Sequence, residues 1–215
     1  MQPSMIYTAL RRQYGSNHSW WPAKSRFEVI VGAILTQNTA WRNVEAAISN
    51  LRKAKMLDIS KISQADLATL KRLVRPAGFY NQKAKRLRDI SRHLMAKWDG
   101  NLDRFFNRPV WQIRDELLEL NGIGPETADS ILLYAGNKPV LPVDTYTFRI
   151  INRLSKSNFR KYEELQGYFY KNICHNSRLF KELHALLVEH AKTTCKTKPI
   201  CRQCVLAGAC ASRKL

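Results

Sequence analysis

Apolar residues recur along the chain at intervals of three and four, the spacing that predicts amphipathic helices. In residues 41–54, for example, Val44, Ile48 and Leu51 fall on one helical face. No segment shows the strict alternation of apolar and polar residues that predicts a half-buried strand. The pattern therefore predicts an all-α protein. Its helices are expected over residues 4–14, 26–35, 41–54, 110–120, 144–154, 161–173 and 179–193, with two more ending at 73 and near 97.

The two remaining helices are recognised by how they begin. Residues 63–66 read Ser-x-x-Asp, which fits a capping box at the start of the helix that ends at 73. Residues 78–85 open a basic amphipathic helix, whose buried stripe would include Leu87, Ile90 and Leu94. We expect these helices to form two lobes with the chemistry between them.

A tight turn joins two apolar helices at Gly122-Ile123-Gly124. Glycine adopts backbone angles closed to other residues, and Pro125 stands where a helix tolerates a missing N–H. The exposed N–H groups of such a hairpin, with Thr127 in the next turn, form a site for an anion such as a DNA phosphate. Taken alone, the motif is equally compatible with a plain two-helix turn.

The charge of the chain favours an anionic partner. It has 36 Lys and Arg against 17 Asp and Glu, a formal net charge of +19 over 215 residues. Such an excess is typical of proteins that bind nucleic acid. The longest run of apolar residues and glycine, 29–35, is too short to span a bilayer, and the N-terminus lacks a signal-peptide core. We expect a cytoplasmic, nucleoid-associated protein.

Four of the five cysteines lie close together near the end of the chain. They form the pattern Cys195-x5-Cys201-x2-Cys204-x5-Cys210, which suits either tetrahedral zinc or an iron–sulfur cluster. The spacing alone does not choose between these metals. Cys174 stands apart and is expected to be a buried apolar residue.

Three basic side chains share the loop of the cysteines. We expect them to meet phosphates, although a solvated basic face is the alternative. They are Lys196, Lys198 and Arg202.

Taken in order, several segments resemble the helix-hairpin-helix DNA glycosylase superfamily, and within it the endonuclease III-like proteins. The resemblance is carried by residues 27–39, 78–85, 118–128 and 143–149 and by the cysteine pattern. It spans nearly the whole chain, and the order of the segments makes it specific.

The resemblance implies a fold and a mode of action. It implies a six-helix barrel at 23–137 with the hairpin at about 112–136, and a second lobe from 1–22 and 138–215. The loop 195–210 would hold a 4Fe–4S cluster, with zinc as the alternative. A damaged nucleotide of double-stranded DNA would be flipped into the cleft between the lobes of a monomer.

Asp144 occupies the position of the family's catalytic aspartate. Cleavage of a C1′–N bond passes through an oxocarbenium-like state, which a nearby carboxylate can stabilise while it positions a water molecule. Asp is also a favoured N-cap, so Asp144 can cap the helix that follows. The two roles are compatible, and its distance from the hairpin favours catalysis.

Glu126 departs from the bifunctional members of the family. Those enzymes carry a lysine at this position, which forms the Schiff base that leads to strand cleavage. The neighbouring residue is Pro125, so a shift of one position does not recover a lysine. The resemblance therefore implies a monofunctional glycosylase that leaves an abasic site.

Three tryptophans suggest the substrate. Trp20 and Trp21 precede the first barrel helix and Trp41 follows its break, as in the small bacterial 3-methyladenine glycosylases, which also carry Glu at position 126. A purine alkylated at N3 or N7 is a cation, which electron-rich rings and a carboxylate attract. Packing inside the protein is the alternative for these rings.

Further residues are expected to touch DNA. Gln37, Asn38 and Phe79 match positions from which relatives insert side chains into the gap left by the flipped base. Lys83, in the basic helix, joins this DNA-binding set. Phe79 is equally compatible with a place in the core.

We therefore predict a monofunctional DNA N-glycosylase that removes alkylated purines, 3-methyladenine foremost and possibly 7-methylguanine. One alternative is an endonuclease III-like enzyme for oxidised pyrimidines or mismatched thymine and uracil. Another is a non-catalytic protein that binds damaged DNA.

Overall fold

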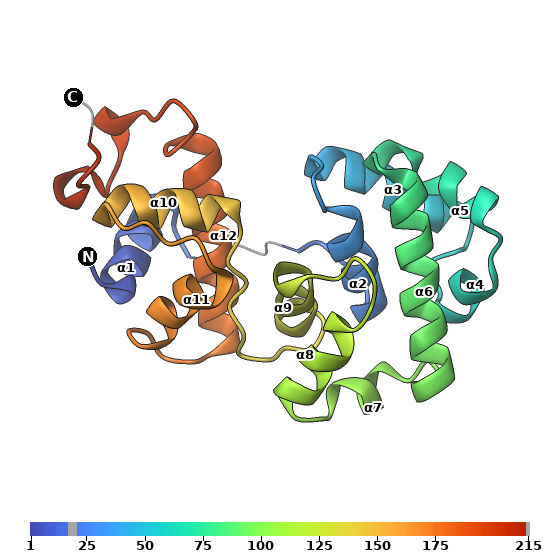
Figure 1. Ribbon diagram of the computed structural model, residues 1–215. Helices are drawn as coiled ribbons and strands as arrows, with labels where there is room; N and C mark the ends of the chain where they lie inside the picture. Colours follow the sequence, from blue (N-terminus) through green and yellow to red (C-terminus); the bar gives the residue numbers. More distant parts are fainter. Residues whose placement is uncertain (17–20, 214–215) are drawn as a thin grey trace. The chain divides into compact units, whose positions relative to one another are not determined.

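A computed structural model of the chain describes residues 1–16 and 21–213 (Figure 1). These residues form helices and turns, and no strand occurs among them, which confirms the predicted all-α class for the described part. The α-helices are α1 (Pro3–Tyr14), α2 (Arg26–Leu35), α3 (Trp41–Lys53), α4 (Ile59–Gln64), α5 (Leu67–Val74), α6 (Tyr80–Trp98), α7 (Leu102–Phe106), α8 (Val110–Leu118), α9 (Pro125–Tyr134), α10 (Thr145–Ser155), α11 (Tyr162–Tyr170) and α12 (Ser177–Thr193). Short 3-10 helices are η1 (Arg75–Ala77), η2 (Cys201–Gln203) and η3 (Ala207–Ala209).

The chain divides into two compact units. The first unit consists of Met1–Pro22 and Pro139–Leu215, and the second of Ala23–Lys138. Helices α1 and α10 to α12 belong to the first unit, and α2 to α9 belong to the second.

Helix α2 is the central element of the second unit. Every residue from Phe27 to Leu35 is buried, as expected for a helix that is apolar on all sides. It contacts α3, α6 and α9, while α6 runs along α4 and α5 (Figure 1). Ser25 caps α2 by accepting a hydrogen bond from the Glu28 backbone N–H. The C-terminal end of α2 therefore lies inside the unit, close to the middle of its helices.

Helix α12 has the same role in the first unit. Its buried residues include Phe180, Leu183 and Leu187, and it contacts α1 and α10. Helix α1 contributes Ile6 and Leu10, both fully buried. The N-terminal helix thus packs against the last helix of the chain.

Most helix boundaries agree with the periodicity to within a few residues, and α2 agrees completely. The capping box predicted at 63–66 is wrong. Ser63 lies inside α4, a short helix that the pattern did not predict, and Asp66 itself caps α5 by accepting from the Thr69 N–H at 2.8 Å. Helices of five or six residues, such as α4 and α7, are too short to leave a periodic signal.

Within the part of the chain that the structure describes, no helix has the length and apolar character needed to cross a membrane.

Candidate functional site

The predicted hairpin joins α8 to α9. Gly122 has a φ of +82°, which glycine adopts without strain. A Cβ at this position would lie 1.9 Å from Arg86 Nε, so the glycine is also needed to let the Arg86 side chain cross the turn. Ile123 is buried, and Gly124 is the N-cap of α9, with Pro125 in the first turn.

Gln37 fastens the turn after α2 to this hairpin. Its Nε2 donates to the Gly122 carbonyl at 2.9 Å and to Thr127 Oγ1 at 3.0 Å. Its Oε1 accepts from Arg86 Nη1. Thr127 is buried, so its hydroxyl faces Gln37 inside the unit. In this structure the side chains of Gln37 and Thr127, both expected to touch DNA, bond to each other.

Phe79 lies on the surface, so the alternative of a core residue is wrong. Its side chain is 62% exposed, and its backbone is left-handed, with φ 45° and ψ 32°. Asn38 is exposed too and has a φ of 52°. A left-handed conformation costs a bulky non-glycine residue such as Phe79 about 1–3 kcal/mol, whereas Asn adopts it more readily. Two exposed residues, of which Phe79 is strained, thus lie in turns that the sequence assigned to DNA.

Lys83 does not fit its predicted contact with DNA. It is 1% exposed, and its ammonium donates to the carbonyls of Leu35 at 2.9 Å and Ala77 at 2.7 Å. Burial lowers the pKa of Lys83 to about 8, and the positive charge of Arg86 adds to the effect. The DNA-binding prediction for Lys83 is wrong because its ammonium points into the protein and has partners there.

Asp144 is the N-cap of α10, as its alternative role required. Its Oδ1 accepts from both the backbone N–H and the hydroxyl of Thr147, each at 2.7 Å. Its Oδ2 lies 3.9 Å from Nε2 of His184, a buried residue of α12. Burial lowers the pKa of His184, and the Asp144 carboxylate opposes that shift. The two hydrogen bonds from Thr147 hold the carboxylate in one orientation.

The residues of the predicted base pocket fall in different parts of the chain. Trp20 lies outside the described residues. Trp21 is half-buried and belongs to the first unit, whereas Trp41, also half-buried, begins α3 in the second. Glu126 is exposed in the first turn of α9.

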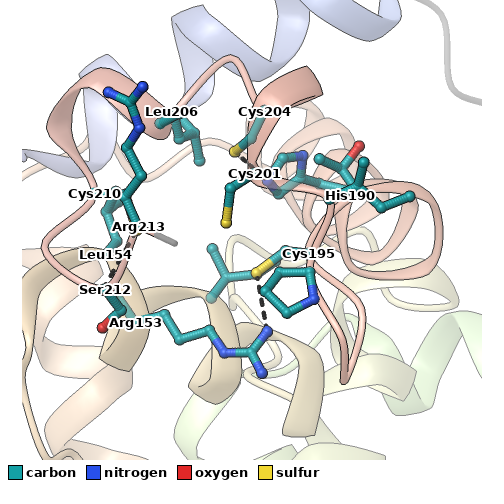
Figure 2. Close-up of a pocket in the computed structure, with 15 residues that line it drawn as sticks. Arg153, Leu154, His190, Cys195, Cys201, Cys204, Leu206, Cys210, Ser212 and Arg213 are labelled. Carbon is teal, nitrogen blue, oxygen red and sulfur yellow. Dashed lines mark hydrogen bonds between the residues drawn. The ribbon is translucent and has the colours of Figure 1, made fainter. Parts of the chain in front are cut away.

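The four clustered cysteines line one cavity in the first unit (Figure 2). The cavity has a volume of about 30 Å³ and is partly open to solvent. His190 Nε2 lies 3.5 Å from Cys204 Sγ, and Arg153 Nη1 lies 3.6 Å from Cys195 Sγ. Among the described residues, no three His, Cys, Asp or Glu side chains are grouped so as to hold a single metal ion.

Burial sets the protonation of the groups in this cavity. It raises the pKa of the Cys204 thiol, and the neighbouring cysteines add to that rise. It lowers the pKa of His190 to about 4, and the ring bonds to Tyr14 Oη at 2.9 Å. The His190 ring is therefore a hydrogen-bonding group in the wall of this cavity.

The loop's basic residues Lys196, Lys198 and Arg202 are exposed, which both of their predicted roles require. Cys174 is exposed as well, so its predicted burial is wrong. It follows α11 in a polar turn whose neighbours Asn172 and His175 are also exposed, and an apolar side chain there has no core to enter.

Sequence reasoning did not find Arg86, which crosses Gly122 and bonds to Gln37. A glycine between two helices can signal that another side chain passes close by, but it does not say which one.

Comparison with known proteins gives relatives along the whole chain. A candidate DNA repair glycosylase of Methanocaldococcus jannaschii is 46% identical over 211 residues, 97% of this chain and 95% of that protein. Endonuclease III of Sulfolobus acidocaldarius is 30% identical, over 96% of this chain and 94% of that enzyme.

Solved structures share the fold. The 3-methyladenine DNA glycosylase of H. pylori, bound to 1,N6-ethenoadenine, is 32% identical with a TM-score of 0.81, and the match covers 89% of this chain and 98% of that one. An endonuclease III–DNA complex has a TM-score of 0.84 at 22% identity, covering 99% and 96% of the two chains. At 22% identity, the similarity to the endonuclease III–DNA complex supports the shared fold and nothing further.

The family described as the HhH-GPD superfamily base excision DNA repair protein matches residues 31–173. That segment includes the second half of α2, the hairpin and Asp144 with the helix it caps. With its endonuclease III-like helical fold and its full-length relatives, the chain belongs to the HhH-GPD superfamily of base excision DNA repair glycosylases.

Proposed function

We propose that this protein is a monofunctional DNA N-glycosylase that removes alkylated purines, 3-methyladenine foremost, and leaves an abasic site. Glu126 carries the proposal. It stands where the bifunctional relatives that the sequence resembles have a lysine nucleophile, and a carboxylate cannot form a Schiff base. The H. pylori enzyme, named as a 3-methyladenine glycosylase, supports the substrate class at 32% identity.

Asp144 acts at the sugar in this proposal. As the C1′–N bond breaks, positive charge develops at C1′, and a fixed carboxylate stabilises it without having to reorient. Thr147 occupies Oδ1 with two hydrogen bonds, so we assign the contact with the sugar or the attacking water to Oδ2. The base departs with the bonding electrons, and water adds to C1′.

The pocket residues act on the base. We propose that Trp20, Trp21 and Trp41 stack on the extruded purine and that Glu126 favours its positive charge. A base alkylated at N3 or N7 is cationic before the bond breaks, so aromatic faces and a carboxylate bind it more tightly than an unmodified purine. Normal bases would be rejected because they lack that charge.

The surface turns and the hairpin hold the DNA. The backbone N–H groups of Gly122 and Gly124 bind a phosphate at the start of α9, while the Ile123 N–H donates to the Leu120 carbonyl at 3.0 Å and closes the turn. Phe79 and Asn38 enter the gap left by the flipped nucleotide and offset the stacking lost there, while Gln37, bonded to the hairpin, holds the turn that carries Asn38. The exposure of both residues and the strained backbone of Phe79 support this assignment.

The cysteine cavity fits a 4Fe–4S cluster better than it fits zinc. A zinc ion needs four sulfurs at about 2.3 Å from one point, whereas a cluster spreads its four ligands around a larger body. All four cysteines line one open cavity, and the imidazole and guanidinium beside two of their sulfurs can donate to thiolates. Cys195, Cys201, Cys204 and Cys210 would hold the cluster, which binds thiolates and orders the loop for phosphate contact.

Release of free bases tests the proposed activity. The purified protein is incubated with methylated duplex DNA, and the released bases are separated by chromatography. We expect 3-methyladenine or 7-methylguanine, with strand breaks appearing only after alkali. Release of pyrimidines alone, or breaks without alkali, would contradict the proposal. Visible absorbance with iron and sulfide analysis tests the cluster, and stoichiometric zinc without iron would overturn it.

A second substrate class has support of its own. Full-length relatives include endonuclease III of Sulfolobus acidocaldarius, and the endonuclease III–DNA complex shares the fold. An enzyme of that kind would remove oxidised pyrimidines, or thymine and uracil from mismatches, with the tryptophans stacking on a neutral base. Duplexes with those lesions, assayed beside the methylated one, separate the two classes.

A further inference from the structure

The buried ammonium of Lys83 bonds to the ends of two other helices. It leaves α6 and donates to the carbonyl of Leu35, the last residue of α2, and to that of Ala77, the last residue of η1. The final carbonyls of a helix have no partner within the helix, and a cation is favoured beside them. One side chain therefore joins α2, η1 and α6 at a single point.

Each of those carbonyls comes immediately before a turn that we assign to DNA. Leu35 is followed by the turn that contains Gln37 and Asn38, and Ala77 by Gly78 and Phe79. The ammonium also lies 5.9 Å from the centre of the Phe79 ring. Both turns thus follow carbonyls that bond to the same buried nitrogen, while the side chains of Asn38 and Phe79 are exposed to solvent.

Packing alone does not require a charge here. An apolar side chain of similar length would fill the space without the cost of removing an ammonium from water. The hydrogen bonds from the ammonium to the Leu35 and Ala77 carbonyls offset this desolvation cost, and they fix one arrangement of the chain. A left-handed residue such as Phe79 keeps its conformation only where its surroundings determine it strongly.

We propose that Lys83 is a positioning residue for the insertion of protein side chains into DNA. It fixes the turn of Gln37 and Asn38 and the turn of Phe79 relative to each other, so that both turns reach the gap left by one flipped nucleotide. The inference rests on the proposed function of those turns. Lys83 itself does not touch DNA.

The test is the variant Lys83→Met, which keeps a long side chain and removes the donors. The probe is a duplex with an abasic-site analogue beside 2-aminopurine, whose fluorescence rises when an inserted side chain unstacks it. We expect the equilibrium constant between the inserted and the non-inserted complex, taken from the fluorescence at saturating protein, to fall about tenfold, the size expected for losing hydrogen bonds from a charged donor. Binding to undamaged duplex should stay within about twofold, because no phosphate contact is lost.

A double-mutant cycle distinguishes positioning from a general loss of structure. In a Phe79→Ala background, Lys83→Met should reduce the remaining signal only slightly, since its effect passes through Phe79. Equal reductions in both backgrounds would overturn the proposal. Lys97→Met is the matched control, because it removes the same charge from an exposed position near the other end of α6. It should leave the signal unchanged.

A measurement on the unmodified protein covers the case in which Lys83→Met does not fold. Nitrogen-15 NMR of lysine ammonium groups should show an exchange-protected signal from Lys83. We expect it to shift when the abasic-analogue duplex binds, and to stay in place in the Phe79→Ala protein. An unchanged signal in both proteins would contradict the inference. Absence of any 2-aminopurine response in the unmodified protein would instead contradict the proposed function.

Discussion

At the residue scale, our proposal of a monofunctional glycosylase, and not of one that also cuts the DNA strand, depends on Glu126. It is exposed in the first turn of α9, two residues after the hairpin. An amine at that place could attack C1′ and stay bound as a Schiff base, whereas a carboxylate leaves hydrolysis as the outcome. The difference is one of chemistry and not of fold.

Glu126→Lys should therefore gain a covalent intermediate. We expect borohydride to trap the variant on DNA that contains an abasic site, and to trap the unmodified protein only at background level. Denaturing gel electrophoresis of labelled DNA measures the adduct. Glu126→Gln is the control, because it removes the charge without supplying an amine. Strong trapping of the unmodified protein would show that another amine acts as the nucleophile.

Asp144 caps α10 and, in the proposed mechanism, also acts at the sugar, and one substitution separates the two roles. Asn caps helices about as well as Asp, so Asp144→Asn should change the free energy of unfolding by less than about 1 kcal/mol. The turnover number should fall by at least about 100-fold, since the charge that stabilises the transition state is gone. Fluorescence anisotropy should find DNA binding retained. Full turnover in this variant would remove Asp144 from the mechanism.

At the element scale, the contact between α6 and α8 depends on one buried carboxylate. Glu116 of α8 accepts from His93 Nε2 and Trp98 Nε1 of α6 and from Arg108, at 2.6–2.7 Å. Burial raises the pKa of Glu116, but the hydrogen bonds from Trp98, His93 and Arg108 outweigh it, so that the pKa lies below its usual value. The ionised form is thus favoured in the folded protein.

The stability that Glu116 contributes should depend on pH. A carboxyl whose pKa is lowered by folding stabilises the protein above its unfolded pKa, and the contribution disappears as the pH falls through the folded value. Glu116→Gln should lower the free energy of unfolding by about 1–3 kcal/mol at pH 7, and by less in acid. Urea denaturation at pH 7 and in acid measures the two free energies of unfolding. Glu119→Gln, at an exposed position of the same segment, is the control. An equal loss at both values of pH would contradict the argument.

The sequence predicted the elements well where a helix is long and its apolar face is continuous, as in α2 and α3. It missed α4 and α7, which hold one or two turns each and have no periodic face to detect. It also assigned a cap to Ser63, because residue types alone do not reveal that Asp58 and Asp66 each cap a separate short helix.

The site was predictable to the extent that its chemistry is local. The hairpin glycines, the Asp144 cap and the cysteines that share a cavity each follow from residue types at fixed spacing. Lys83 was not predictable in this way. Its burial depends on where the last carbonyls of α2 and η1 lie, and those positions are set by packing between segments almost 50 residues apart.

At the scale of the whole molecule, the net charge of +19 governs how the protein meets DNA. Each cation that neutralises a phosphate releases a counterion, so binding weakens as salt rises. The exposed lysines of the cysteine loop fit such contacts, whereas the buried Lys83 does not. Affinity for undamaged duplex therefore reports the surface charge separately from recognition of the lesion.

Lys198→Ala should weaken binding to every duplex by a similar factor. If Lys198 meets a phosphate, the slope of log K against log salt should become shallower by about 1. Anisotropy titrations at several salt concentrations measure the slope, and visible absorbance checks that the variant carries the proposed cluster to the same extent as the unmodified protein. An unchanged slope would place Lys198 on a solvated face.

The most direct test of the whole account is a competition under single-turnover conditions. Equal amounts of a duplex with one alkylated purine and a duplex with one oxidised pyrimidine are mixed with excess protein, and both free bases are followed in time. We predict faster release of the alkylated purine, strand breaks only after alkali, and no release by the Asp144→Asn protein. Faster release of the oxidised pyrimidine would contradict the proposed substrate, and breaks without alkali would contradict the interpretation of Glu126.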